Sequence, residues 1–197
     1  MHFEAGQLYH VYNRGNNGQQ LFFTPNHYLH FLHKLRAHIR PHCQLLAYCL
    51  MPNHFHLLLY ATQGGTQPGD TPSSAKQPLT RGISTALSSY SQGLNKQLGN
   101  SGAVFAPKTK MRLVTGTHEN YPRTCLHYLH QNPLRAGLVT QLAAWPYSSY
   151  RDYVGQRAGS LCNQDLAREL LDLPLDHAAF EAESARAIDP ENVKGWR

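Results

Sequence analysis

The sequence has no run of apolar residues long enough to span a bilayer, and residues 1–15 lack the basic-then-apolar pattern of a secretory signal. We therefore expect a cytoplasmic protein. The four cysteines show no CxxC spacing, which argues against a disulfide framework or a cysteine zinc site and predicts reduced, packed thiols. Acidic residues are the scarcer charge, 12 against 18 lysines and arginines. The resulting net charge of +6 suits a polyanionic partner such as nucleic acid.

A pair of histidines lies in residues 51–60, MPNHFHLLLY, a run suited to a β-strand. Successive strand side chains point to opposite faces, so His54 and His56 share one face, and Phe55 and Leu57 lie on the core face. Two imidazoles ~6–7 Å apart along a strand can converge on one divalent cation. The same pattern also suits polar residues on the solvated face of a sheet. With 13 histidines in the chain, the pair alone does not decide between these readings.

Periodicity and turn residues predict the other elements. They are a strand at 8–13, a helix at 25–40 with His27 on its surface, an interior strand at 44–50, a helix at 78–98, a strand or extended arm at 104–114, and a helical region at 161–183. The tight connection after residue 50 predicts an antiparallel hairpin with the histidine strand. Residues 62–77, dense in Gly, Pro, Ser and Thr, are expected to form a mobile surface loop, and 189–197 a frayed tail.

Basic residues near two of these strands are candidate phosphate contacts. Lys108, Lys110 and Arg112 alternate along the arm at 104–114, so they can line a phosphate track or protect a sheet edge from aggregation. Arg14 ends the first strand and is either a phosphate contact or a solvated loop residue. Phe105, beside the track, is either a base-stacking or a core residue.

A second cluster of candidate site residues lies on the helix predicted from Tyr121, with Pro122 in its first turn. Tyr128 and Asn132 lie one turn apart on one stripe of this helix, which is expected to end at about Asn132 because Pro133 follows. A tyrosine phenol can attack phosphorus if a cation polarises the phosphate, and an amide carbonyl is a neutral oxygen ligand for such a cation. Tyr128 is otherwise a half-buried helix tyrosine.

Four segments together resemble one known family: LYHVYNRG, LLAYCLMPNHFHLLL, YLHQNPLRAGLV and WPYSSYRDYVG, in this order over about the first four-fifths of the chain. They are similar to the IS200-like (Y1, HUH) transposases, especially the REP-associated tyrosine transposase branch. The resemblance implies an α+β fold, with helices packed on a ferredoxin-like antiparallel sheet and the histidine pair on a central strand. It also implies a catalytic domain at 1–155 and a C-terminal helical extension and tail at 156–197.

The resemblance further implies a divalent metal, Mg²⁺ or Mn²⁺. The family's two metal-binding histidines map onto His54 and His56. The third ligand position maps onto Asn132, where relatives often carry glutamine, with His130 or Gln131 as alternatives.

Tyr128 maps onto the family's nucleophile. The implied activity is cleavage and transfer of single-stranded DNA near a hairpin, of the repetitive extragenic palindrome type, through a 5′-phosphotyrosine. Arg135, shortly after the tyrosine, is placed to touch a phosphate or is structural. The length of chain beyond Gly155 favours a monomer over a homodimer, and a nucleoid-associated location follows from the DNA substrate. The rivals are a non-catalytic hairpin-binding protein and a phosphoesterase that uses a metal-bound water.

Overall fold

The computed structural model describes residues 1–68, 75–115, 121–186 and 188. Its strands form one antiparallel sheet in the order β2-β3-β1-β4. The strands are β1 (Leu8–Arg14), β2 (Cys43–Met51), β3 (His54–Ala61) and β4 (Lys110–Leu113). The helices are α1 (Pro25–His38), α2 (Gln63–Thr66), α3 (Pro78–Leu98), α4 (Tyr121–Arg135), α5 (Tyr150–Tyr153), α6 (Gln164–Leu171) and α7 (His177–Ser184). This strand order and the alternation of strands with α1 and α3 are those of a ferredoxin-like fold, which confirms the expected fold class.

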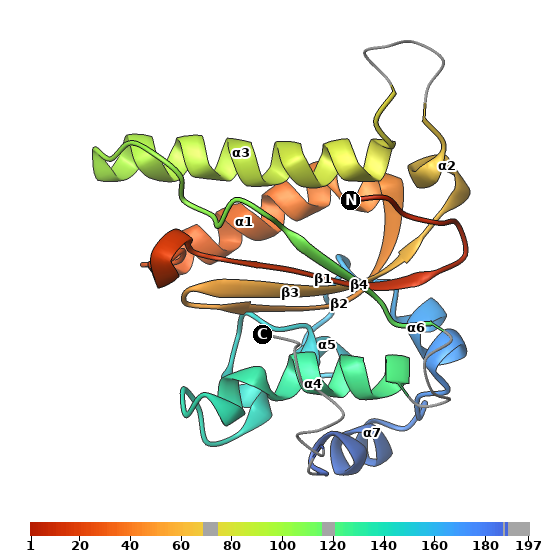
Figure 1. The fold of residues 1–197 in the computed structure, drawn as a ribbon. Helices are drawn as coiled ribbons and strands as arrows, with labels where there is room; N and C mark the ends of the chain where they lie inside the picture. Colours follow the sequence, from red (N-terminus) through yellow and green to blue (C-terminus); the bar gives the residue numbers. More distant parts are fainter. Residues whose placement is uncertain (69–74, 116–120, 187, 189–197) are drawn as a thin grey trace.

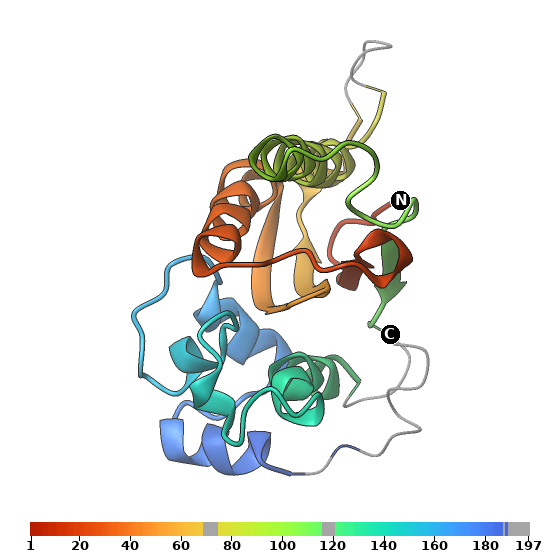
Figure 2. The ribbon, with the colours of Figure 1, turned by 90° about the vertical axis from the view of Figure 1, so that its left-hand side faces the viewer.

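Helices cover both faces of the sheet (Figures 1 and 2). Helices α1 and α3 pack on one face, where Phe31 of α1 and Ile83 of α3 meet Phe55 and Leu57 of β3. Helices α4 to α7 lie on the other face, where Leu58 of β3 joins the second apolar cluster. Because β3 is an inner strand with a helical layer on each side, its residues are held from four directions.

The strand at 44–50 lies at an edge of the sheet, so the expectation of an interior strand is wrong. Strand β2 is apolar on both faces because helices cover both faces. Later segments of the chain also satisfy its outer edge: Tyr147 O accepts from Leu50 N at 2.9 Å, and Ser149 N donates to Tyr48 O at 3.0 Å. An apolar pattern reports burial of side chains, and it does not report how many strands pair with the backbone.

Helix α4 continues through Pro133 to Arg135, three residues beyond the expected end. A proline near the end of a helix removes only one intrahelical hydrogen bond, and the last turn here is closed by a glycine cap. Gly137 has φ +69°, its N–H donates to Leu134 O at 3.0 Å, and Leu138 N–H donates to Pro133 O at 2.9 Å. Asn132 therefore keeps a helical position one turn after Tyr128.

Two further expectations differ from the structure, and it decides between the two alternatives for Phe105. His27 is buried instead of lying on the surface of α1, since its Nδ1 accepts from Phe23 N and its Nε2 lies 3.1 Å from Gln97 Oε1. Strand β4 is shorter than the arm at 104–114, and it begins after Lys108. Phe105 is a core residue packed among aromatic rings of the α1–α3 layer.

The remaining expectations concern the cysteines, the loop and the tail. All four cysteines are buried and free, as expected. The loop at 62–77 contains the short helix α2, while its residues 69–74 and the tail at 189–197 lie outside the described residues. In the described parts of the chain, no helix is long and apolar enough to cross a membrane.

The C-terminal extension is fastened to α4 by an ion-pair cluster. Arg123 of α4 binds Glu183 of α7 with two guanidinium nitrogens, and His127 Nε2 lies 2.9 Å from the same carboxylate. Burial alone raises the pKa of Glu183, but the hydrogen bonds from Arg123 and His127 outweigh it and leave the pKa below its ordinary value.

We predict that Glu183→Gln lowers the free energy of unfolding by about 1.5–3 kcal/mol at pH 7, the usual range for hydrogen bonds to a charged group. Because the folded state lowers this pKa, the stabilisation is present above the unfolded carboxyl pKa of about 4.3 and is lost as the pH falls through the folded pKa. Urea unfolding at pH 7 and at acid pH measures the difference. Glu181→Gln, on the exposed side of α7, is the matched control; an equal loss in both variants contradicts the prediction.

Candidate functional site

The histidine pair lies on the inner strand β3, facing the α4 layer. His56 is 1% exposed and His54 is half-buried, and their ring centroids are 5.0 Å apart at 87°. The neighbouring strand β1 brings Tyr12 opposite His56 and Arg14 opposite His54. The expectation that the two histidines share a face of a central strand is confirmed by this sheet.

Two residues of β1, His10 and Tyr12, contact His56. Their sequence pattern predicted a strand but no part in the site. His10 Nε2 lies 2.9 Å from His56 Nδ1, and the two rings stack with centroids 5.0 Å apart. Tyr12 stacks on both, 4.7 Å from His10 and 5.8 Å from His56. Alternation along LYHVYN places His10 and Tyr12 on one face, but only the pairing of β1 with β3 shows that this face is the one with the histidines.

Burial keeps the His10 imidazole of this cluster neutral. Burial, and secondarily the nearby Arg112, lowers the pKa of His10 to about 3, so this imidazole is uncharged at neutral pH. His54 Nδ1 lies 2.7 Å from Asn53 Oδ1, so each histidine of the pair uses Nδ1 for a hydrogen bond within the protein. Nε2 is therefore the ring nitrogen through which each would bind a cation.

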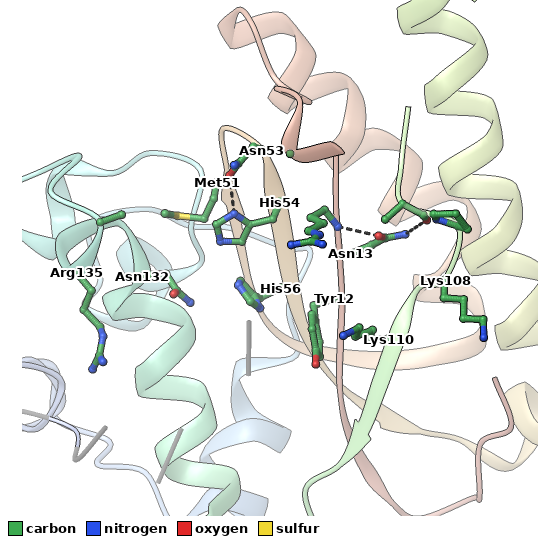
Figure 3. Close-up of a pocket in the computed structure, with 15 residues that line it drawn as sticks. Tyr12, Asn13, Met51, Asn53, His54, His56, Lys108, Lys110, Asn132 and Arg135 are labelled. Carbon is green, nitrogen blue, oxygen red and sulfur yellow. Dashed lines mark hydrogen bonds between the residues drawn. The ribbon is translucent and has the colours of Figure 1, made fainter. Parts of the chain in front are cut away.

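Helix α4 supplies Tyr128 and Asn132 on the opposite side of the site. The Tyr128 ring lies 6.0 Å from the His56 ring at 82°, and the Arg135 guanidinium stands over it at 5.7 Å. The Asn132 side chain extends from α4 toward His56 (Figure 3). It is 6% exposed, and its buried Nδ2 has no hydrogen-bond partner among the described residues.

The two alternative third ligands point away from the histidines. His130 Nε2 lies 2.9 Å from Ser149 Oγ, and its ring packs against Tyr150. Gln131 donates to the backbone oxygens of Ser184 and Arg186, each at 2.8 Å. Of the three candidates, only Asn132 faces the histidine pair.

The site opens into a cavity of about 770 Å³ that the histidines, Asn132 and basic residues line together (Figure 3). Its lining includes four cations, Arg14, Lys108, Lys110 and Arg135, and none of its described lining residues is acidic. Arg112, the fifth candidate phosphate contact, lies outside this lining, with its guanidinium 5.6 Å from the Tyr121 ring centroid. A positive rim without carboxylates attracts polyanions.

The donor set fits a divalent cation. Within the described residues, no three His, Cys, Asp or Glu side chains gather into a metal site, so two imidazoles need a ligand of another type. The amide of Asn132 supplies one, because a half-turn of the side-chain amide exchanges Nδ2 for the carbonyl oxygen with little change in shape. Asn132 Nδ2 is buried without a partner among the described residues, and Asn132 lines the same cavity as the two histidines, so after this half-turn the carbonyl oxygen would occupy the unsatisfied position.

A search of solved structures finds a REP-associated tyrosine transposase bound to a REP hairpin, with a TM-score of 0.58 and 17% identity over 83% of this chain and 92% of that chain. The chain has the fold of a REP-associated tyrosine transposase. This match confirms the fold that the sequence resemblance implied; the roles of His54, His56, Tyr128 and Asn132 stay predictions.

Two structures of a bacterial tRNA(His) guanylyltransferase-like protein also match. The GTP complex has a TM-score of 0.37 and 6% identity over 70% of this chain and 71% of that chain. The ATP complex has a TM-score of 0.37 and 8% identity over 93% and 72%. Both scores are too low to carry an argument. No family model matches the sequence, and no curated protein matches it.

If the Asn132 amide binds a ligand and does not stabilise the fold, its removal does not lower the free energy of unfolding. We predict that Asn132→Leu raises the free energy of unfolding by up to about 1 kcal/mol, because a buried donor without a partner is costly. The neighbouring Gln131→Leu is the matched control and loses about 2 kcal/mol, since its amide makes two hydrogen bonds. Urea unfolding measures both, and a loss in Asn132→Leu equal to that in Gln131→Leu would show that the amide is structural.

Proposed function

We propose that this protein is a metal-dependent transesterase that cleaves and rejoins single-stranded DNA next to a hairpin, as IS200-like tyrosine transposases do. One observation carries the proposal: two histidines of β3 and Asn132 of α4, whose buried Nδ2 has no partner among the described residues, line the same cavity as four cations. A stable fold does not require these groups to face one another. Metal-dependent phosphoryl transfer uses this combination of metal ligands and positive charge.

His54 and His56 would hold the cation through Nε2, and Asn132 through its amide oxygen. When bound, a divalent cation supplies charge that polarises the scissile phosphate and lowers the cost of forming a phenolate. Imidazole and amide donors are compatible with Mn²⁺, and Mg²⁺ would depend more on phosphate and water oxygens.

Tyr128 is the proposed nucleophile. Its phenol oxygen forms a bond to phosphorus, the bond from phosphorus to the 3′ oxygen breaks, and the phenol proton is exchanged for one on the released 3′-hydroxyl through solvent. The product is a 5′-phosphotyrosine that a later hydroxyl can attack, so no nucleotide cofactor is needed. The Tyr128 ring lies 6.0 Å from the His56 ring of the same chain. This distance supports a nucleophile that serves its own subunit and a protein that is active as a monomer.

Hairpin DNA is the proposed partner. The transposase with the same fold is bound to a REP hairpin, and the four cations that line the cavity can contact the backbone of a strand leaving such a hairpin. Tyr12, half-buried in the lining, offers an aromatic face beside this path.

We predict that Tyr128→Phe forms no covalent adduct with single-stranded hairpin DNA in the presence of Mn²⁺, whereas the unsubstituted protein forms one that resists denaturing electrophoresis. Tyr121→Phe, at the start of the same helix, is the matched control and retains the adduct. An adduct formed by Tyr128→Phe assigns the nucleophile to another residue. DNA cleavage that persists without an adduct supports hydrolysis by a metal-bound water instead.

One observation favours a second candidate, a hairpin-binding protein without catalysis. Tyr128 is 1% exposed and is not among the residues that line the cavity, so its hydroxyl must be uncovered before it can react. This second function predicts hairpin binding that is unchanged in His54→Ala, together with no cleavage of any hairpin by the unsubstituted protein.

DNA binding through the cavity makes a separate prediction about salt. Lys108→Ala and Lys110→Ala should each reduce the slope of log affinity against log salt by about 0.7–0.9, the loss of one phosphate contact. Arg112→Ala removes a cation of β4 that lies outside the cavity lining, and its slope should be unchanged. Fluorescence anisotropy with a labelled hairpin at 50–200 mM salt, roughly the range in which such slopes are measured, gives the comparison. Equal slopes in all three variants contradict the proposed DNA path.

A further inference from the structure

We propose that His10 is a positioning residue for the metal ligand His56: it accepts a hydrogen bond from His56 Nδ1–H and thereby keeps the Nε2 lone pair directed at the cavity. This inference rests on the proposed function, because it assumes that His56 binds a cation. It adds a residue of β1 that does not itself line the cavity.

The contact between the two imidazoles is close and fully enclosed. His10 is 0% and His56 is 1% exposed, their nitrogens lie 2.9 Å apart, and their rings are within 24° of parallel. A hydrogen bond in such a dry environment is stronger than one in water, and it cannot be replaced by solvent. Tyr12, stacked on both rings, holds them in this orientation.

The hydrogen bond determines which nitrogen of His56 carries the proton. One proton is shared between His10 Nε2 and His56 Nδ1, so one ring donates and the other accepts. A histidine that binds metal through Nε2 must carry its proton on Nδ1. His56 is then the donor, and His10 accepts at Nε2 and has its own proton on Nδ1.

The other histidine of the pair has an equivalent partner. When His54 binds a cation through Nε2, its Nδ1 carries the proton and donates it to Asn53 Oδ1 across the 2.7 Å contact. Both ligands are thus prepared in the same tautomer. Asn53 is an exposed residue at the hairpin turn, whereas His10 is buried in the sheet, and we expect His10 to contribute more to orientation.

Two substitutions of His10 distinguish the effect of its hydrogen-bond acceptor from the effect of its flat ring. His10→Phe keeps a flat ring for stacking but removes the acceptor, and His10→Gln keeps an acceptor at similar reach. The probe is Mn²⁺ alone, with affinity measured by isothermal titration calorimetry, so the readout does not depend on cleavage. We expect His10→Phe to weaken Mn²⁺ binding about 10–100-fold, the usual effect of losing such a partner, and His10→Gln to recover most of that affinity.

The matched control is His27→Phe, which replaces another buried histidine, on helix α1, whose layer covers the other face of the sheet (Figure 1). It should leave Mn²⁺ affinity unchanged. Binding by His10→Phe within about twofold of the unsubstituted protein, or equal losses in His10→Phe and His10→Gln, overturns the role of the hydrogen bond. The proposed function survives those results, provided that His54→Ala still abolishes Mn²⁺ binding. If the unsubstituted protein binds no Mn²⁺, both proposals fail.

A measurement on the unsubstituted protein covers the case in which His10→Phe does not fold. Long-range ¹H–¹⁵N correlation spectra report the protonated nitrogen of each neutral imidazole. We expect His56 to be protonated at Nδ1 and His10 also at Nδ1. Protonation of His56 at Nε2 overturns the inference without any substitution.

Discussion

The pairing of β1 with β3 is the constraint on which the site depends. It places Arg14, Tyr12 and His10 alongside the histidine pair, and it buries the His10–His56 hydrogen bond between two strands that are each paired on both sides. A shift of one residue in this register would turn His10 and Tyr12 toward the α1–α3 layer. The register of β1 and β3 therefore determines which side chains of β1 lie beside His54 and His56.

The site also depends on the position of α4 on the sheet, because this helix carries Tyr128 and Asn132. Leu126 and Leu129 pack on β2 and β3, and the ion-pair cluster of Arg123 and Glu183 fastens the other side of the helix to α7. This double attachment orients the stripe that carries Tyr128 and Asn132. The C-terminal extension thus contributes to the site without lining its cavity.

Buried groups and charged groups occupy different parts of the site. The neutral imidazole of His10, the buried ring of His56 and the Asn132 amide occupy the interior, whereas the four lining cations lie at its exposed rim. Buried cations would be costly to desolvate and would repel a metal ion, and exposed ones attract a phosphate backbone at little cost. The arrangement suits a polyanion that approaches from solvent while its scissile group enters the interior.

Local sequence by itself predicted the approximate positions of the strands and of the longer helices, the shared face of His54 and His56, and the spacing of Tyr128 and Asn132, because side-chain alternation and helical periodicity are properties of neighbouring residues. It did not determine the edge position of β2, the burial of His27, the continuation of α4 through Pro133, or the partnership of His10 with His56. The continuation of α4 depends on the nearby Gly137 cap, which the proline rule alone does not take into account. The other three depend on groups that are distant along the chain: the backbone of Tyr147 and Ser149, the side chain of Gln97, and the β1–β3 register. Only the tertiary structure brings such groups together, since each contact becomes favourable only after the sheet and its two helical layers have assembled.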